Sequence, residues 1–354
     1  MKGRTAALMQ HGFEVSELRG RPRSIRVRRI REALIYTSLV GCALFSVAIT
    51  FAIIFVLFRE TMGFFGSHAD AAHNGGVTRV SVWEFLTGTE WTPLLGAEHH
   101  YGVLPLVCGT LLVASVAALI AIPLGLVTAV FLSEYASARL RAILKPTLEV
   151  LAGIPTVVYG FFALTVITPA LRGAGLWFTG SSFGAWFGRT TGWYSEPTPI
   201  FEVYNAAGAG VAVGIMCLPI VCSLSEDAIR ATPRALREGA YAVGGTKFDV
   251  SAKVVIPAAL SGIVAAFLLA IARAVGETMA VSLAAGGLAN LTMNPAEPVQ
   301  TMTAWIVQIF LGDASNFGPE YRSAYAVAAM LFLMTLALTI IGNRVLKRYR
   351  EVYQ

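Results

Sequence analysis

One polar segment decides the fold of this chain, residues 225–257, which read SEDAIRATPRALREGAYAVGGTKFDVSAKVVIP. It joins two long apolar stretches and mixes charged residues with good helix formers. The pair Gly244–Gly245 is a usual end of a helix, and Thr246 is a suitable start for a second one. Small side chains at Gly239 and Ala240 allow a partner to approach closely. The segment therefore predicts a helix–glycine–helix hairpin at a membrane surface, shaped to dock into a cleft of another protein.

The composition identifies a lipid bilayer as the main solvent of this chain. Of its 354 residues, 56% are hydrophobic and 14% are charged, and the mean hydropathy is +0.66. Soluble domains carry about 25% charged residues. A net charge of +6 also occurs in nucleic-acid-binding proteins, but here the basic residues lie almost entirely in the terminal segments and loops that flank the apolar stretches. We therefore expect no nucleic-acid partner.

Six apolar stretches are long enough to cross the hydrocarbon layer, which takes about 20 residues of helix. They are residues 34–58, 103–132, 147–170, 203–224, 258–289 and 322–343. We therefore predict an all-α membrane protein with six transmembrane helices. The expected organisation is a basic N-terminal segment (1–33), a first transmembrane helix (34–58), an amphipathic outer segment (59–102), a five-helix core (103–343) that contains the loop 225–257, and a C-terminal segment (344–354).

The basic residues set the orientation, because cytoplasmic loops carry an excess of Lys and Arg. Of the 27 Lys and Arg residues, 21 fall on the side that holds both termini and the polar loop, five fall on the other side, and Arg273 lies within a span. We expect both termini to be cytoplasmic, with the basic run 19–31 anchoring the first helix at the membrane lipid. Four tryptophans of the outer segments are interpreted as interfacial anchors, namely Trp83, Trp91, Trp177 and Trp186.

Two charged residues interrupt the fifth span, where residues 270–283 read AIARAVGETMAVSL. A charge at the centre of a transmembrane helix costs about 2.5–3.5 kcal/mol, so Arg273 and Glu277 need a physical reason. Residues four apart share one face of a helix, and we expect these two side chains to pair. Two interpretations stay open: a structural ion pair that fixes helix packing, and a polar pathway to which Thr278 and Ser282 add hydroxyl groups.

A second candidate for a pathway is GIPTVVYG, residues 153–160, whose proline and glycines free backbone groups. Thr156 and Tyr159 would line a conduit there, and ordinary helix packing is an equally good explanation. The stretch GVAVG at 210–214 has the glycine spacing of close helix contacts, for which packing suffices. Three outer residues have only a loosely metal-like spacing, and we expect no metal site there: His68, Asp70 and His73.

The polar loop resembles the EAA loop of ABC importer permeases, which reads Glu-Ala-Ala, three residues, Gly, nine residues, Ile, one residue and Leu-Pro. The corresponding positions here are Glu238, Gly239, Ala240, Gly244, Val254, Ile256 and Pro257, with mild departures at Gly239, Val254 and Ile256. The resemblance implies a type I ABC importer permease fold with a cytoplasmic coupling helix. In that family the coupling helix sits in a groove of the ATP-hydrolysing subunit. The residues it assigns to this contact are Glu238, Gly239, Ala240, Tyr241, Gly244 and Pro257.

Further segments resemble the phosphate-specific permeases of the Pst system, in particular the PstC family. They are FLTGTEWTP (85–93), GVLPLVCGTLL (102–112), FLSEYA (131–136), LEVLAGIPTVVYGFFAL (148–164) and ARAVGETMAV (272–281). The resemblance implies that phosphate passes Arg273 and Glu277, in the inner membrane of a bacterium. Phosphate suits an arginine, because a guanidinium presents a planar fork to two phosphate oxygens.

The resemblance also implies the partners: a homologous second permease (PstA-like), an ATP-binding subunit dimer (PstB-like) and an extracytoplasmic phosphate-binding protein (PstS-like). We expect no cofactor on this chain and ATP with Mg²⁺ on the ATP-binding subunit, since none of the five lysines follows a glycine as a Walker A motif requires. The chain is therefore expected to be a transport subunit and not an enzyme. Two alternatives stay open: the same machine carrying sulfate, molybdate or phosphonate, and an ion-driven secondary carrier, which would show inverted repeats.

Overall fold

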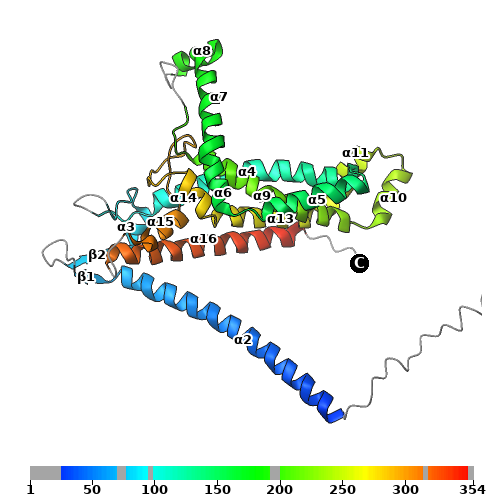
Figure 1. The fold of residues 1–354 in the computed structure, drawn as a ribbon, viewed down its shortest axis with the longest axis horizontal. Helices are drawn as coiled ribbons and strands as arrows, with labels where there is room; N and C mark the ends of the chain where they lie inside the picture. The colour runs from blue at the N-terminus through cyan, green and yellow to red at the C-terminus, as the bar shows by residue number, and fades with distance from the viewer. Residues whose placement is uncertain (1–24, 70–76, 95–98, 192–199, 314–317, 350–354) are drawn as a thin grey trace, which may run out of the picture. The chain divides into compact units, whose positions relative to one another are not determined.

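The computed structural model describes residues 25–69, 77–94, 99–191, 200–313 and 318–349. These residues are mostly helical, so the prediction of an all-α membrane protein is confirmed apart from one short antiparallel hairpin, β1 (Ser67–Ala69) with β2 (Val77–Arg79) (Figure 1). The helices are α2 (Ile25–Phe64), α3 (Val82–Thr87), α4 (Leu104–Val130), α5 (Ala138–Ala152), α6 (Thr156–Phe162), α7 (Thr168–Gly180), α8 (Ser182–Thr191), α9 (Ala206–Ala231), α10 (Arg234–Ala242), α11 (Lys247–Val250), α12 (Ile256–Ala258), α13 (Leu260–Val275), α14 (Met279–Ala284), α15 (Met302–Gln308) and α16 (Pro319–Tyr349). Turns of π-helix extend several of them, at η1 (Phe131–Tyr135), η2 (Ala163–Ile167), η3 (Ser251–Val255) and η4 (Ile309–Asp313).

The chain forms two compact units, Met1–Val56 and Leu57–Gln354. The described part of the first unit is the length of α2 up to Val56, which is apolar around its circumference after the charged first turns IRVRRIRE. Its hydroxyl groups bond within the helix, as Thr37 and Thr50 donate to the carbonyl oxygens four residues earlier at 2.8 and 3.0 Å. A helix surrounded by hydrocarbon must satisfy its polar groups in this way. The second unit holds the remaining elements.

Length and hydropathy identify the segments that can cross a membrane. Five helical segments of the described chain qualify: Arg29–Phe64, Leu104–Tyr135, Thr156–Gly180, Ala206–Ala231 and Pro319–Lys347. A sixth candidate is a bent pair, Lys247–Ala258 and Leu260–Val275, whose halves meet at 70°. Counting the bent pair as one span confirms the expected number of six.

Two of the predicted spans have the wrong limits, and in both cases a break in the helix is the reason. The predicted span 147–170 begins later, because α5 ends at Ala152 and the next helix starts after Pro155. Proline cannot donate a backbone hydrogen bond and disfavours helix in the residue before it. The predicted span 258–289 stops early, because α13 ends before Gly276 and a separate short helix, α14, follows.

The centre of the second unit is the contact between α4 and α9. In the most apolar part of α9, 67% of the residues are buried, the largest share among the five straight spans. The two helices approach closely because glycines face α4: a Cβ atom at Gly210 would lie 2.6 Å from Val116 Cβ, and one at Gly214 would lie 3.1 Å from Ala117 O. The packing interpretation of GVAVG is therefore confirmed.

A cluster of aromatic rings closes the outer part of the second unit. Trp91 is 4% exposed and packs edge-on against Trp305 with ring centroids 5.2 Å apart, and Phe85 lies beside it at 6.3 Å. The interpretation of Trp91 as an interfacial anchor is therefore wrong, since its ring fills the protein core. Trp83 and Trp177 do present exposed rings, at 75% and 78%.

We predict that Gly210→Ala and Gly214→Ala each destabilise the protein by about 1–3 kcal/mol, the usual cost of overpacking. Gly173→Ala is the matched control, because a Cβ atom there meets nothing within 4 Å and gains the same helix propensity. Thermal unfolding of the purified protein in detergent gives the comparison. Equal melting temperatures for the three variants would contradict the packing role.

Candidate functional site

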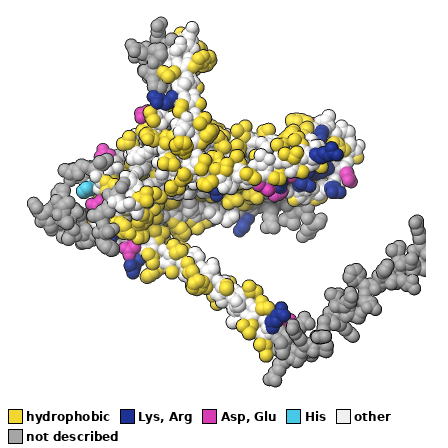
Figure 2. Space-filling model, in the orientation of Figure 1, with side chains coloured by type: hydrophobic (Ala, Val, Ile, Leu, Met, Phe, Trp, Pro, Cys, Tyr) yellow, Lys and Arg dark blue, Asp and Glu magenta, His cyan; other side chains and the backbone are white. Residues whose placement is uncertain are grey.

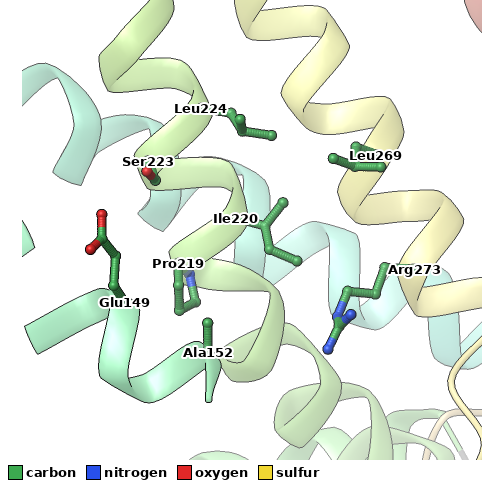
Figure 3. Close-up of a pocket in the computed structure, with 8 residues that line it drawn as sticks. All are labelled: Glu149, Ala152, Pro219, Ile220, Ser223, Leu224, Leu269 and Arg273. Carbon is green, nitrogen blue, oxygen red and sulfur yellow. The ribbon is translucent and has the colours of Figure 1, made fainter. Parts of the chain in front are cut away.

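Arg273 lies in a cavity of about 640 Å³ between α5, α9 and α13. The lining residues are Glu149, Ala152, Pro219, Ile220, Ser223, Leu224, Leu269 and Arg273. Figure 3 shows the Arg273 guanidinium directed from α13 towards α9 and the end of α5, with Glu149 on the far side of the cavity. Most of the lining is apolar, so one guanidinium and one carboxylate set the electrostatics of this space.

Glu277 does not pair with Arg273, so this expectation is wrong. The helix that carries Arg273 ends at Val275, and the two side chains therefore do not share one helical face. Glu277 is buried, and its carboxylate accepts a hydrogen bond from the backbone N–H of Ala280 at 3.3 Å, at the start of α14. Its backbone carbonyl accepts another from Thr303 Oγ1 at 2.7 Å. Glu277 thus holds the break between α13 and α14 in place.

Arg273 itself makes no ion pair or hydrogen bond with any side chain in the part of the chain that the structure describes. A guanidinium in an apolar cavity with its donors free can accept an oxyanion without first breaking an ion pair. This is the chemical property that distinguishes the site.

The other predicted pathway residues lie outside the lining of this cavity. Thr278 Oγ1 donates to Gly276 O at 3.2 Å, and Ser282 Oγ donates to Thr278 O at 2.7 Å. Tyr159 is buried, and its hydroxyl donates at 2.7 Å to Leu151 O, in the last turn of α5, which also accepts from Ile154 N–H at 3.3 Å. Tyr159 therefore stabilises the helix break.

In the segment 153–160, the second glycine, Gly160, serves helix packing. Thr156 itself is half-buried at the start of α6. A Cβ atom at Gly160 would lie 3.0 Å from the Cα atom of Ala280, so α6 and α14 touch through backbone. Of the six predicted pathway residues, the structure brings only Arg273 to the cavity.

The predicted hairpin of the polar loop is confirmed in detail. Gly244 follows α10 with φ of 86°, a left-handed conformation that favours glycine. Gly244 N–H donates to Tyr241 O at 3.0 Å and Gly245 N–H to Ala240 O at 3.2 Å, which is the Schellman pattern of a helix end. The Thr246 hydroxyl then accepts from Asp249 N–H at 3.2 Å and starts α11.

The outward face of this hairpin is exposed, and its small residue is not needed for packing within the chain. Glu238, Gly239 and Tyr241 are exposed on α10, while Pro257 lies in α12. A Cβ atom at Gly239 would meet nothing within 4 Å. Figure 2 shows Lys and Arg side chains gathered around the α10 and α11 end of the second unit.

A charge cluster around the buried Glu226 was not among the predicted sites. Glu226 of α9 is 0% exposed, and its carboxylate lies 2.6 Å from Lys145 Nζ, 3.8 Å from Arg141 Nε and 3.3 Å from Arg230. Lys145 also reaches Asp227 at 2.7 Å. Burial of the Lys145 ammonium alone would lower its pKa, but the hydrogen bonds to Asp227 and Glu226 outweigh this and raise the pKa above 10.5, so Lys145 stays charged.

Two arginines connect this cluster to the ends of neighbouring helices. Arg141 donates to the carbonyl oxygens of Leu132 and Ser133 at 2.7 and 2.9 Å, where α4 ends in η1. From α10, Arg237 pairs with Glu134 at 2.6 Å and donates to Ile229 O at 2.7 Å. The sequence does show that the apolar helix α9 ends in charged residues. It does not show which residues they pair with, because the paired residues lie far apart in the sequence.

No cluster of metal-binding side chains is found among the described residues. Of the three outer residues with metal-like spacing, Asp70 and His73 lie outside the described residues. The site is therefore described by Arg273, its cavity and the charge cluster below it.

Curated proteins of similar sequence are membrane transport permeases. The chain is 33% identical over 276 residues to the "Probable ABC transporter permease protein YqgH" of Bacillus subtilis, which covers 78% of this chain and 81% of that protein. It is 34% identical to the "Phosphate transport system permease protein PstC" of Xylella fastidiosa, over 75% of this chain and 78% of the relative. The "Probable phosphate transport system permease protein PstC" of Methanocaldococcus jannaschii is 31% identical, over 84% of this chain and 91% of the relative.

The fold is that of solved importer permeases. A chain in the crystal structure of a bacterial alginate ABC transporter, in complex with its alginate-bound periplasmic protein, superposes with a TM-score of 0.58 at 15% identity, covering 92% of this chain and 98% of that one. Residues 121–351 match the family described as "Binding-protein-dependent transport system inner membrane component". The chain therefore belongs to the family of inner membrane components of binding-protein-dependent transport systems, as a multi-pass transport subunit.

Proposed function

We propose that this chain is the permease subunit of an ATP-driven importer of inorganic phosphate, with Arg273 as the residue that receives the anion. The observation that carries the proposal is a guanidinium with free donors in an apolar cavity of about 640 Å³ between three helices. Several relatives of similar length are named phosphate transport permeases, which supports phosphate as the cargo.

The chemistry of the cavity suits a phosphate ion. The planar fork of Arg273 matches two phosphate oxygens, and an apolar lining strengthens each charge-assisted hydrogen bond. Across the cavity, the carboxylate of Glu149 repels an anion that moves away from Arg273 on that side. Glu277 acts on the anion through geometry, since it fixes the helix break next to Arg273.

The energy for uptake comes from a partner chain in this proposal. An anion entering a negatively charged cell opposes about 2.3 kcal/mol per charge per 100 mV, and this sequence has no Walker A motif. ATP and Mg²⁺ would bind a PstB-like dimer, while a PstA-like permease completes the path and a PstS-like protein delivers phosphate. Both termini and the α10–α11 hairpin would face the bacterial cytoplasm, as the excess of basic residues on that side favours.

The open space around Gly239 supports docking of α10 on the ATP-binding subunit. No contact among the described residues requires a glycine there, although glycine weakens a helix by about 1 kcal/mol relative to alanine. Close approach of another protein explains the small residue. Glu238 and Tyr241, which flank it, are exposed for the same contact.

We predict that Arg273→Ala lowers phosphate uptake by at least about 100-fold while the complex still assembles, because two charge-assisted hydrogen bonds of about 1.5–3 kcal/mol each are lost. Uptake by Arg273→Lys should lie between that of Arg273→Ala and that of the native chain, since an ammonium keeps the charge but lacks the planar fork of a guanidinium. Arg344→Ala, an exposed arginine on α16, is the matched control. Uptake of radiolabelled phosphate by cells that lack the native chain gives the measurement.

The same assay decides the cargo and the energy source. Uptake should require the chain, disappear when cellular ATP is depleted and ignore excess sulfate, molybdate and phosphonate. Inhibition by one of these oxyanions would move the cargo to that ion. Uptake that survives ATP depletion would favour a secondary carrier.

We predict that Gly239→Leu weakens binding of the ATP-binding subunit by about 10–100-fold, the effect of an overpacking cost of about 1–3 kcal/mol. Gly239→Ala is the control, because a methyl group is the side chain that the EAA loop itself carries at this position. Co-purification and titration of the detergent-solubilised complex measure both. Equal binding by the two variants would show that α10 is not the docking helix.

A further inference from the structure

The buried charge cluster lies between the coupling hairpin and the Arg273 cavity. Lys145 precedes the cavity residue Glu149 by four positions on α5, and Glu226 follows the cavity residue Ser223 by three positions on α9. Each charged residue is therefore about one helical turn from the cavity lining. The ion pair between them joins the two helices directly below the cavity at 2.6 Å.

Polar contacts help to hold helix α5 in position. None of its residues is fully buried, and its apolar contacts with the core are made by partly buried residues such as Leu151. Leu144 and Leu148 contribute partly buried contacts to the cluster at the cytoplasmic ends of the helices. The contacts with the shortest distances are polar: Lys145 to Glu226 and Asp227, and Arg141 to carbonyl oxygens of η1.

The other end of the cluster reaches the coupling helix. Arg237 of α10 binds Glu134 of η1 and the last turn of α9. Arg141 binds the carbonyl oxygens of η1 next to Glu134 and lies 3.8 Å from Glu226. A series of polar contacts thus runs from α10 to η1 through the Arg237–Glu134 ion pair, and from η1 to α5 through backbone carbonyl oxygens that accept from Arg141. The buried carboxylate of Glu226 on α9 faces two cations of α5, Lys145 at 2.6 Å and Arg141 at 3.8 Å, so these contacts tie α5 to α9.

We propose that Lys145 and Glu226 are positioning residues that transmit movement of the coupling helix α10 to the α5 wall of the Arg273 cavity. The proposal rests on the proposed function, in which α10 contacts the ATP-binding subunit. In this arrangement ATP hydrolysis moves α10, and the charged contacts carry α5 with it. Loss of the ion pair leaves ATP hydrolysis intact but separates it from the cavity.

The first test is the ratio of phosphate taken up to ATP hydrolysed by the full reconstituted complex in proteoliposomes. Lys145→Met should lower this ratio by at least about tenfold while ATP hydrolysis and assembly persist. Lys145→Arg should restore it, because the ion pair is kept. Arg230→Met is the matched control, since Arg230 contacts the same carboxylate from within α9 and does not hold α5.

A variant that merely fails to assemble is separated from an uncoupled one by co-purification of the ATP-binding subunit. If Lys145→Met does not assemble, Arg237→Gln tests the same connection from the coupling helix and should show the same loss. A ratio unchanged in an assembled Lys145→Met or Arg237→Gln complex overturns the proposal. An equal loss in Arg230→Met also overturns it, because the effect would then belong to the carboxylate alone.

A second readout does not depend on the cargo. In the complex with Cys42 replaced by Ala, the labelling rate of a cysteine introduced by Glu149→Cys should change when the ATP-binding subunit is trapped with vanadate. The additional Lys145→Met change should abolish that difference. If wild-type proteoliposomes take up no phosphate but the labelling difference depends on Lys145, the proposed cargo fails and the positioning role stands. A difference that persists without Lys145 overturns the positioning role.

Discussion

A polar group that leaves water costs free energy unless it finds a partner inside the protein, and this constraint acts most strongly where the helices of the chain begin and end. The hydroxyl of Tyr159 satisfies a carbonyl where α5 stops. The carboxylate of Glu277 satisfies an N–H group where α14 starts. At the C-terminal ends of two other helices, arginines bind carbonyl oxygens: Arg141 binds Leu132 O just after α4, and Arg237 binds Ile229 O in the last turn of α9. The helix dipole favours cations at these ends. Specific side chains therefore stabilise the helix breaks and ends, and the candidate site lies beside them.

Local patterns predicted the number of spans and the hairpin, although the local breaks at Pro155 and Gly276 were missed. The length of apolar runs predicts the number of spans, and the Gly244–Gly245 pair predicts the hairpin, because both signals act over a few residues. The glycine spacing of 210–214 likewise predicts a close helix contact. The family resemblance, carried by the EAA loop, supplies the fold class that patterns alone leave open.

Contacts between distant residues were beyond sequence reasoning. Lys145 and Glu226 are 81 positions apart, and no periodicity links them. The expected pairing of Arg273 with Glu277 was wrong because it assumed one continuous helix, whereas Gly276 ends α13 between the two residues. Trp91 was misplaced for a related reason: composition shows an aromatic outer segment, and only the fold shows which rings turn inward to meet Trp305.

The bend of 70° between Lys247–Ala258 and Leu260–Val275 has a mechanical consequence for the arginine. The two axes are closer to perpendicular than to parallel, so a displacement along the first segment has only a small component along the second. In the proposed transport cycle, a push delivered along the first segment from the hairpin would displace α13 sideways more than lengthwise. Since Arg273 lies in the last turn of α13, its guanidinium would move sideways with the helix. The bend thus converts a lengthwise displacement of one segment into a mainly sideways displacement of the next.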